Sequence, residues 1–175
     1  ASDPLYQALL PIRGKGLNVE KALASRDAER LMANNKELQG IIAAVGAGSM
    51  ELFDHTQMRY GKIILLTDAD DDGRHIELLL MTMFYRVMPG LIENGHLWVA
   101  RPPLFSVATR KGRVYLRDED ERDEFLSSPE GRGLEDSIMR FKGLGEMNPD
   151  QLSQTAMHPH TRSIVQISIE DASVA

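Results

Sequence analysis

The spacing of apolar residues predicts two helices in the first half of the chain. Segment 34–45 carries an apolar residue every three or four positions, which predicts an amphipathic helix. Asn34 followed by Glu37 has the spacing of a capping box at a helix start, and Gly46 can adopt the left-handed backbone that ends a helix. Segment 75–88 is apolar on most sides and is followed by a Pro-Gly pair, so it predicts a second, more buried helix.

Continuous apolar runs predict the strands. Segment 62–67 is apolar without alternation, as is typical of a strand covered on both faces, and segment 97–100 is a similar run that ends before a Pro-Pro pair. Segment 7–11 is also strand-like, because the residue before a proline favours extended backbone. Strand, helix and strand in this order predict an α/β fold with an open, mainly parallel sheet flanked by helices.

Composition narrows the class of protein. The chain has 175 residues, enough for one domain with a core, or for one domain with a small appendage. It contains no cysteine, which excludes disulfide scaffolds and thiolate zinc sites. There is no apolar run of about 18 residues and no signal-peptide pattern at the start, so we expect a cytoplasmic protein with no membrane partner.

The negative charge of the chain is concentrated in one segment. The formal net charge is −6, and segment 117–136 alone, with nine acidic and three basic residues, carries a net charge of −6. The rest of the chain is therefore neutral, and we expect the acidic segment to be a solvated helix and loop. A nucleic-acid partner stays open, since metal ions and a few basic residues can face a phosphate backbone.

An acidic cluster follows the 62–67 strand, in the sequence Thr-Asp-Ala-Asp-Asp-Asp-Gly. Alternate residues of an extended segment point to the same side, so we expect Asp68, Asp70 and Asp72 to converge and Asp71 to point away. Ligands of open α/β sheets bind at the carboxyl ends of the strands. Like charges this close need a cation, and hard carboxylate oxygens suit Mg²⁺, with Mn²⁺ as a substitute.

Other roles for the same residues stay open. Aspartates at a helix start also cap the helix and interact with its positive end. The Asp-x-Asp-x-Asp-Gly pattern also opens a calcium loop of the EF-hand kind, but Leu79 stands where that loop needs a glutamate. His75 is interpreted as a capping or DNA-facing residue rather than a metal ligand.

Four segments together resemble the B subunits of bacterial type IIA DNA topoisomerases, which are gyrase and topoisomerase IV. The Pro-Ile-Arg-Gly-Lys and Lys-Gly-Leu-Gly-Glu-Met blocks are highly specific for them, whereas Asp-x-Asp alone also occurs in primases and some nucleases. The segments occur in the family's order and span nearly the whole chain. They are Leu10–Ala22, Thr67–Ile76, Arg101–Phe105 and Arg140–Pro149.

The resemblance implies a Rossmann-like TOPRIM domain that uses Mg²⁺ to cleave and rejoin double-stranded DNA. Asp68 and Asp70 would be the principal ligands, with Asp72 nearby. A tyrosine of a partner A subunit would attack the DNA phosphate, within an A2B2 heterotetramer. The implied division of the chain is a TOPRIM core, an acidic insertion and the C-terminal part of the TOPRIM region, over residues 1–110, 111–136 and 137–175.

The same resemblance assigns DNA contacts and shows departures from the family pattern. Arg13, Lys15 and Asn18 match positions that contact DNA near the cut. The family's catalytic Glu-Gly-Asp-Ser-Ala motif is not in this chain, so we expect no catalytic residue within it, and ATP would be used by a domain that is also not present here. Asp71 stands where the family usually has an apolar residue, and Gly16 replaces a usual aliphatic one.

Three functions are compatible with these features. The first is the cleavage domain of a topoisomerase subunit, inactive as an isolated chain. The second is a non-catalytic DNA- or protein-binding module, and the third is a stand-alone TOPRIM metal nuclease or primase-like enzyme. Gyrase and topoisomerase IV are not distinguished, because supercoiling depends on DNA wrapping by the A subunit.

Overall fold

The computed structural model describes residues 2–12 and 18–174. Its elements form two units that share the chain. The first half contains, in order, α1 (Val19–Leu23), α2 (Ala28–Asn34), α3 (Lys36–Val45), η1 (Met50–Leu52), η2 (His55–Gln57), β1 (Ile63–Leu65), α4 (Asp71–Val87), α5 (Pro89–Glu93) and β2 (Leu97–Ala100). The second half contains β3 (Phe105–Thr109), β4 (Gly112–Leu116), α6 (Glu119–Ser127), η3 (Glu135–Ser137), β5 (Ile138–Arg140), η4 (Leu144–Glu146), α7 (Pro149–Leu152), the π-helical turn η5 (Ser153–Met157), β6 (Ile164–Gln166) and α8 (Ile169–Val174).

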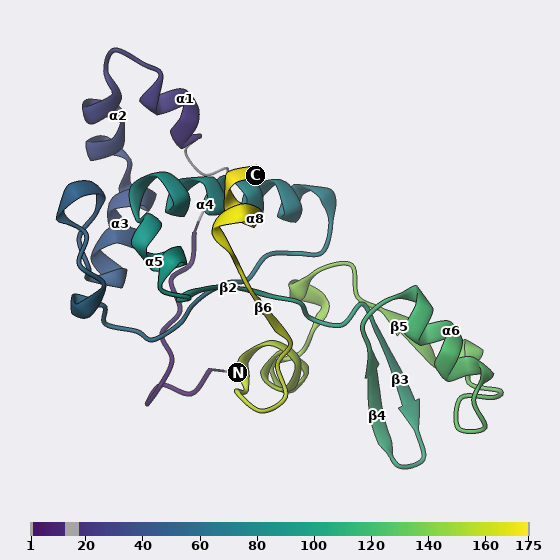
Figure 1. Cartoon of the computed structure of the whole chain (residues 1–175). Coiled ribbons are helices and arrows are strands. Elements are labelled where there is room, and N and C mark those ends of the chain that lie inside the picture. Colours follow the sequence, from purple (N-terminus) through teal and green to yellow (C-terminus); the bar gives the residue numbers. More distant parts are fainter. Residues whose placement is uncertain (1, 13–17, 175) are drawn as a thin grey trace.

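The larger unit is built on a sheet with the strand order β1-β2-β6. β1 and β2 are parallel, and β2 and β6 are antiparallel. In Figure 1, α4 and α8 lie on one side of β2 and β6, and α1 and α2 stand beyond α4. Apolar side chains of α4, α5 and β2 fill the space between helices and sheet, and the most deeply buried are Phe84, Val87, Met88, Leu91, Leu97 and Val99. The C-terminal segment belongs to this unit, since Ile167 and Ala172 are buried in the same core.

The smaller unit is an antiparallel sheet with the order β4-β3-β5, accompanied by α6. It has its own core of Phe105, Val107 and Leu116, and Figure 1 shows it in green, projecting from the larger unit. The acidic segment forms α6 as expected, and its helix has no buried residue. The predicted boundary between residues 110 and 111 lies in the turn of the β3–β4 hairpin, so the small unit also includes β3.

The α/β class is confirmed, with a different proportion of strand pairings. Among the described residues one pairing is parallel and three are antiparallel, so the sheets are mixed rather than mainly parallel. Strand 97–100 has the predicted bounds, and the 62–67 strand is shortened to 63–65. Segment 7–11 is not a strand: Leu9 and Leu10 are 63% and 49% exposed, and the Gln7 side chain donates instead to the Met157 carbonyl oxygen at 2.6 Å.

The predicted helices are present, with different starts. Asn35 rather than Asn34 caps α3, because its Oδ1 accepts a hydrogen bond from the Leu38 N–H at 2.8 Å. Gly46 ends this helix with a φ of 76°, as predicted. The helix expected from residue 75 begins at Asp71, since a carboxylate at its N-cap holds the first turn. Within the described part of the chain, no helix combines the length and apolar character needed to cross a membrane.

Candidate functional site

The acidic cluster lies just after β1 and at the start of α4. Asp70 is the N-cap of α4, where its Oδ1 accepts a hydrogen bond from the Gly73 N–H at 2.7 Å. Gly73 is required here for space, because a Cβ at this position would lie 2.1 Å from the Asp68 carbonyl oxygen. The first turn of α4 therefore packs directly on the backbone of the acidic cluster, and Asp70 takes the capping role that was open from the sequence.

Asp68 is held by a segment far along the chain. Its Oδ1 accepts a hydrogen bond from the Leu144 N–H at 2.8 Å, and a Cβ at Gly143 would lie 3.1 Å from the same oxygen. This closing loop, residues 142–146, is itself held by a hydrogen bond of 2.8 Å from the Lys142 N–H to the Glu146 carboxylate. The Lys-Gly-Leu-Gly-Glu block thus lies against the acidic cluster, which sequence spacing alone did not indicate.

Asp71 and Asp72 belong to the first turn of α4, so the alternation expected of an extended segment stops at Asp70. Among the described residues, no three histidine or acidic side chains surround a common point where a metal could bind. The expected convergence of Asp68, Asp70 and Asp72 is therefore not found, and the role of Asp72 stays a prediction. The side chain of Asp71 is fully exposed and lies 4.0 Å from Arg74.

The chemistry of the remaining donors fits a divalent cation. Asp68 and Asp70 are exposed, and each uses one carboxylate oxygen for a backbone N–H, while the other oxygen has no hydrogen bond within residues 2–12 and 18–174. Mg²⁺ is commonly held by one or two carboxylates, with waters and substrate phosphates as its other ligands. Two oriented carboxylates at a strand end are therefore a suitable donor set for an ion that shares its site with a phosphate.

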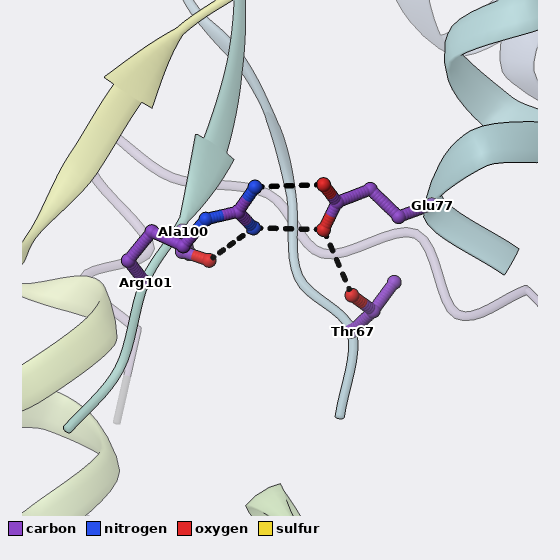
Figure 2. Close-up of polar contacts among 4 residues, drawn as sticks. All are labelled: Thr67, Glu77, Ala100 and Arg101. Atoms are coloured by element: carbon purple, nitrogen blue, oxygen red, sulfur yellow. Dashed lines mark hydrogen bonds and ion pairs between the residues drawn. The ribbon is translucent and has the colours of Figure 1, made fainter. Parts of the chain in front are cut away.

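An ion pair that the sequence interpretation missed lies beside this cluster. The Arg101 guanidinium forms two hydrogen bonds with the Glu77 carboxylate, at 2.7 and 2.8 Å (Figure 2). The Thr67 hydroxyl is 3.5 Å from Glu77 Oε2, and Arg101 Nη1 is 3.4 Å from the Ala100 carbonyl oxygen. Hydrogen bonding to Glu77 raises the pKa of Arg101 above its ordinary value. The available signal was two opposite charges near the ends of one β-α-β unit, but a separation of 24 residues leaves their pairing undetermined.

The predicted DNA-contacting residues are only partly described. Arg13 and Lys15 lie outside the described residues. Asn18 is exposed and caps α1, because its Oδ1 accepts a hydrogen bond from the Lys21 N–H at 2.9 Å. Its predicted contact with DNA stays a prediction.

Comparison with known proteins identifies the family. Residues 2–102 match the model of the Toprim domain, and residues 135–175 match that of the DNA gyrase B subunit, carboxyl terminus. Proteins named as the B subunit of DNA gyrase are 46% identical to the chain in Thermotoga maritima, 45% in Archaeoglobus fulgidus and 42% in Mycolicibacterium smegmatis, over 100%, 98% and 99% of the chain. The chain spans 26% of the length of each of these relatives. The chain therefore belongs to the Toprim domain family, and its resemblance to the B subunits of type IIA topoisomerases is confirmed.

Proposed function

We propose that this chain is the Mg²⁺-binding DNA cleavage and religation domain of an ATP-dependent type II topoisomerase B subunit. One observation carries the proposal: the hydrogen bond from the Leu144 N–H to Asp68 joins the two matched families at an acidic residue. Asp68 lies in the Toprim match, and Leu144 lies in the match to the gyrase B carboxyl terminus. A closing loop specific to gyrase-type proteins that orients a carboxylate of the cluster favours this function over a general Toprim nuclease.

Asp68 and Asp70 are the proposed ligands of Mg²⁺ or Mn²⁺, with Asp72 adding negative charge close by. The bound ion would stabilise the charge that develops on the reacting phosphate and the leaving oxygen. The N–H groups of Leu144 and Gly73 orient the two carboxylates by occupying one oxygen of each. The free oxygens can then face a cation without a further rearrangement of the loop.

The DNA and protein partners follow from the same proposal. Arg13, Lys15 and Asn18 would contact the phosphate backbone of double-stranded DNA, which positions the duplex without reading its sequence. The nucleophilic tyrosine would come from an A subunit in an A2B2 heterotetramer, and ATP would be used by another domain of the B subunit. We place this activity in the cytoplasm, where the DNA of a bacterial cell is accessible to it.

The experiment is DNA cleavage by the complete polypeptide that carries this chain, mixed with its A subunit, Mg²⁺ and plasmid. Asp68→Asn and Asp70→Asn are expected to abolish cleavage and religation, while Asp71→Asn, a charge-matched change in the same cluster, retains them. Thermal unfolding of each variant controls for folding. Full cleavage by Asp68→Asn or Asp70→Asn would contradict the proposal.

A second arm separates this function from the nuclease alternative. The isolated chain is incubated with supercoiled plasmid and Mg²⁺, and the plasmid is expected to stay intact because the attacking tyrosine is supplied by the A subunit. Reproducible nicking that is lost in Asp70→Asn would support a metal nuclease instead. ATP-dependent supercoiling by the reconstituted enzyme would identify a gyrase, and relaxation alone would identify a topoisomerase IV.

A further inference from the structure

The ion pair between Glu77 and Arg101 connects the two supports of the acidic cluster. We propose that it is a positioning pair, which holds Asp68 and Asp70 in the relative placement that metal binding needs. The inference rests on the proposed metal site and adds to it two residues that touch neither the metal nor DNA in that proposal. Three lines of contact lead from the pair to the cluster.

Glu77 determines where the start of α4 lies. It stands seven residues after Asp70, about two helical turns, so the helix transmits its position to the capped first turn. Its side chain is only 13% exposed, which shields the pair from solvent. Its Oε2 is also 3.5 Å from the hydroxyl of Thr67, the residue directly before Asp68. Glu77 therefore contacts both the helix that carries Asp70 and the segment that carries Asp68 (Figure 2).

Arg101 determines where the closing loop is anchored. Its backbone N–H donates to the Ser163 carbonyl oxygen at 2.8 Å, which ties it to the segment before β6. Three residues later, the Leu104 carbonyl oxygen accepts a hydrogen bond of 2.8 Å from the N–H of Phe141. Phe141 directly precedes the loop whose Leu144 N–H binds Asp68.

The pair thus closes a circuit from α4 through Arg101 and the closing loop back to Asp68. Without it, each carboxylate keeps its own backbone hydrogen bond, but the two supports can shift relative to each other. Mg²⁺ requires near-ideal coordination geometry, so a small shift weakens its binding. The two-pronged contact of a guanidinium with a carboxylate adds the directional restraint that this role needs, and a lysine ammonium does not reproduce it.

The test is an Mn²⁺ titration of the 175-residue chain, followed by paramagnetic broadening of the Gly73 and Leu144 amide signals in NMR spectra. These amides donate to Asp70 and Asp68, so they report on the two carboxylates directly. Glu77→Gln and Arg101→Ala are both expected to weaken Mn²⁺ affinity, by about three- to tenfold. Arg101→Lys keeps the charge and loses the two-pronged contact, and is expected to weaken affinity as well.

The paired variants separate positioning from simple charge. Removing the Glu77 charge would weaken cation binding by electrostatics alone, whereas removing the Arg101 charge would strengthen it. Only positioning predicts a loss of affinity in both. Lys111→Ala, which breaks the exposed Lys111–Glu130 pair of 2.6 Å in the small unit, is the matched control and should leave affinity unchanged.

The outcomes distinguish this inference from the proposed function. Opposite changes in Glu77→Gln and Arg101→Ala, or no change in either, would overturn the positioning role while the metal site stands. An absence of Mn²⁺ binding by the wild-type chain would overturn the proposed metal site and the role of the pair with it. If a full removal unfolds the chain, judged by its amide spectrum, the milder Arg101→Lys decides: wild-type affinity in that variant refutes the inference.

Discussion

Replacing Gly73 with alanine sets helix propensity against the packing of the acidic cluster. Gly73 is in the first turn of α4, and alanine is favoured over glycine in a helix by about 1 kcal/mol. The added Cβ, however, would lie 2.1 Å from the Asp68 carbonyl oxygen and 2.8 Å from its carbonyl carbon, where ordinary contact begins at 3.4 Å. The backbone of Asp68 must then move by more than 1 Å, because the atoms that clash are not the end of a flexible side chain.

The size of the effect follows from these contacts. Overpacking costs about 1–3 kcal/mol, and the 2.8 Å hydrogen bond from Leu144 to Asp68 that the displacement breaks contributes about 1 kcal/mol. After the gain in helix propensity, we expect Gly73→Ala to lower the free energy of unfolding by about 1–3 kcal/mol. For a domain of this size each kcal/mol corresponds to about 2–4 °C in Tm.

Gly40→Ala is the matched control, since Gly40 is also in a helix, α3, and a Cβ there would have nothing within 4 Å. It is expected to raise Tm, while Gly73→Ala lowers it and weakens Mn²⁺ binding at least tenfold. Thermal unfolding followed by circular dichroism and the Mn²⁺ titration measure the two effects. A Gly73→Ala variant as stable as Gly40→Ala, with wild-type Mn²⁺ affinity, would refute the reasoning.

Three further predictions concern the core, the cluster and α8. Phe84→Ala, at a side chain that is 2% exposed, should lower the free energy of unfolding by about 3–5 kcal/mol in chemical denaturation; a loss below about 1 kcal/mol would contradict the described core. Asp71→Val should keep the cleavage rate of the reconstituted enzyme within about tenfold, because this side chain is fully exposed; a loss as deep as that of Asp68→Asn would make Asp71 a ligand. Hydrogen bonds from Ser168 lower the pKa of Asp171, so the docking of α8 should be complete above the ordinary carboxyl pKa and weaken as the pH falls through the lowered one, and NMR titration of Asp171 at or above its ordinary pKa would disprove this.

Motifs and family resemblance led to the correct segments before their contacts were known. The Asp-rich cluster, the Arg-Pro-Pro segment and the Lys-Gly-Leu-Gly-Glu block were each recognisable in the sequence. The structure brings all three to one place, where the Leu144 N–H binds Asp68 and Arg101 binds Glu77. Their common location could not be predicted from their spacing, because it depends on the path of the chain between them.

The interpretation of the acidic cluster shows where local reasoning stops. Alternation in an extended segment predicted that Asp68, Asp70 and Asp72 converge, but α4 begins at Asp71 and turns Asp72 into a helical residue. The capping alternative, weighed from the same residues, describes Asp70 correctly. Two local rules competed within three residues, and the start of the helix decided between them.

What the sequence by itself determined are the features whose causes lie within a few residues. The strand 97–100, the end of α3 at Gly46 and the exposed acidic helix are of this kind, since apolar spacing, left-handed backbone and charge act locally. Only the tertiary structure decided that a loop 76 residues away orients Asp68, and that Glu77 and Arg101 pair across 24 residues. Such contacts depend on how sheet and helices pack as a whole, because the core places distant backbone segments within hydrogen-bonding range and no local pattern encodes that distance.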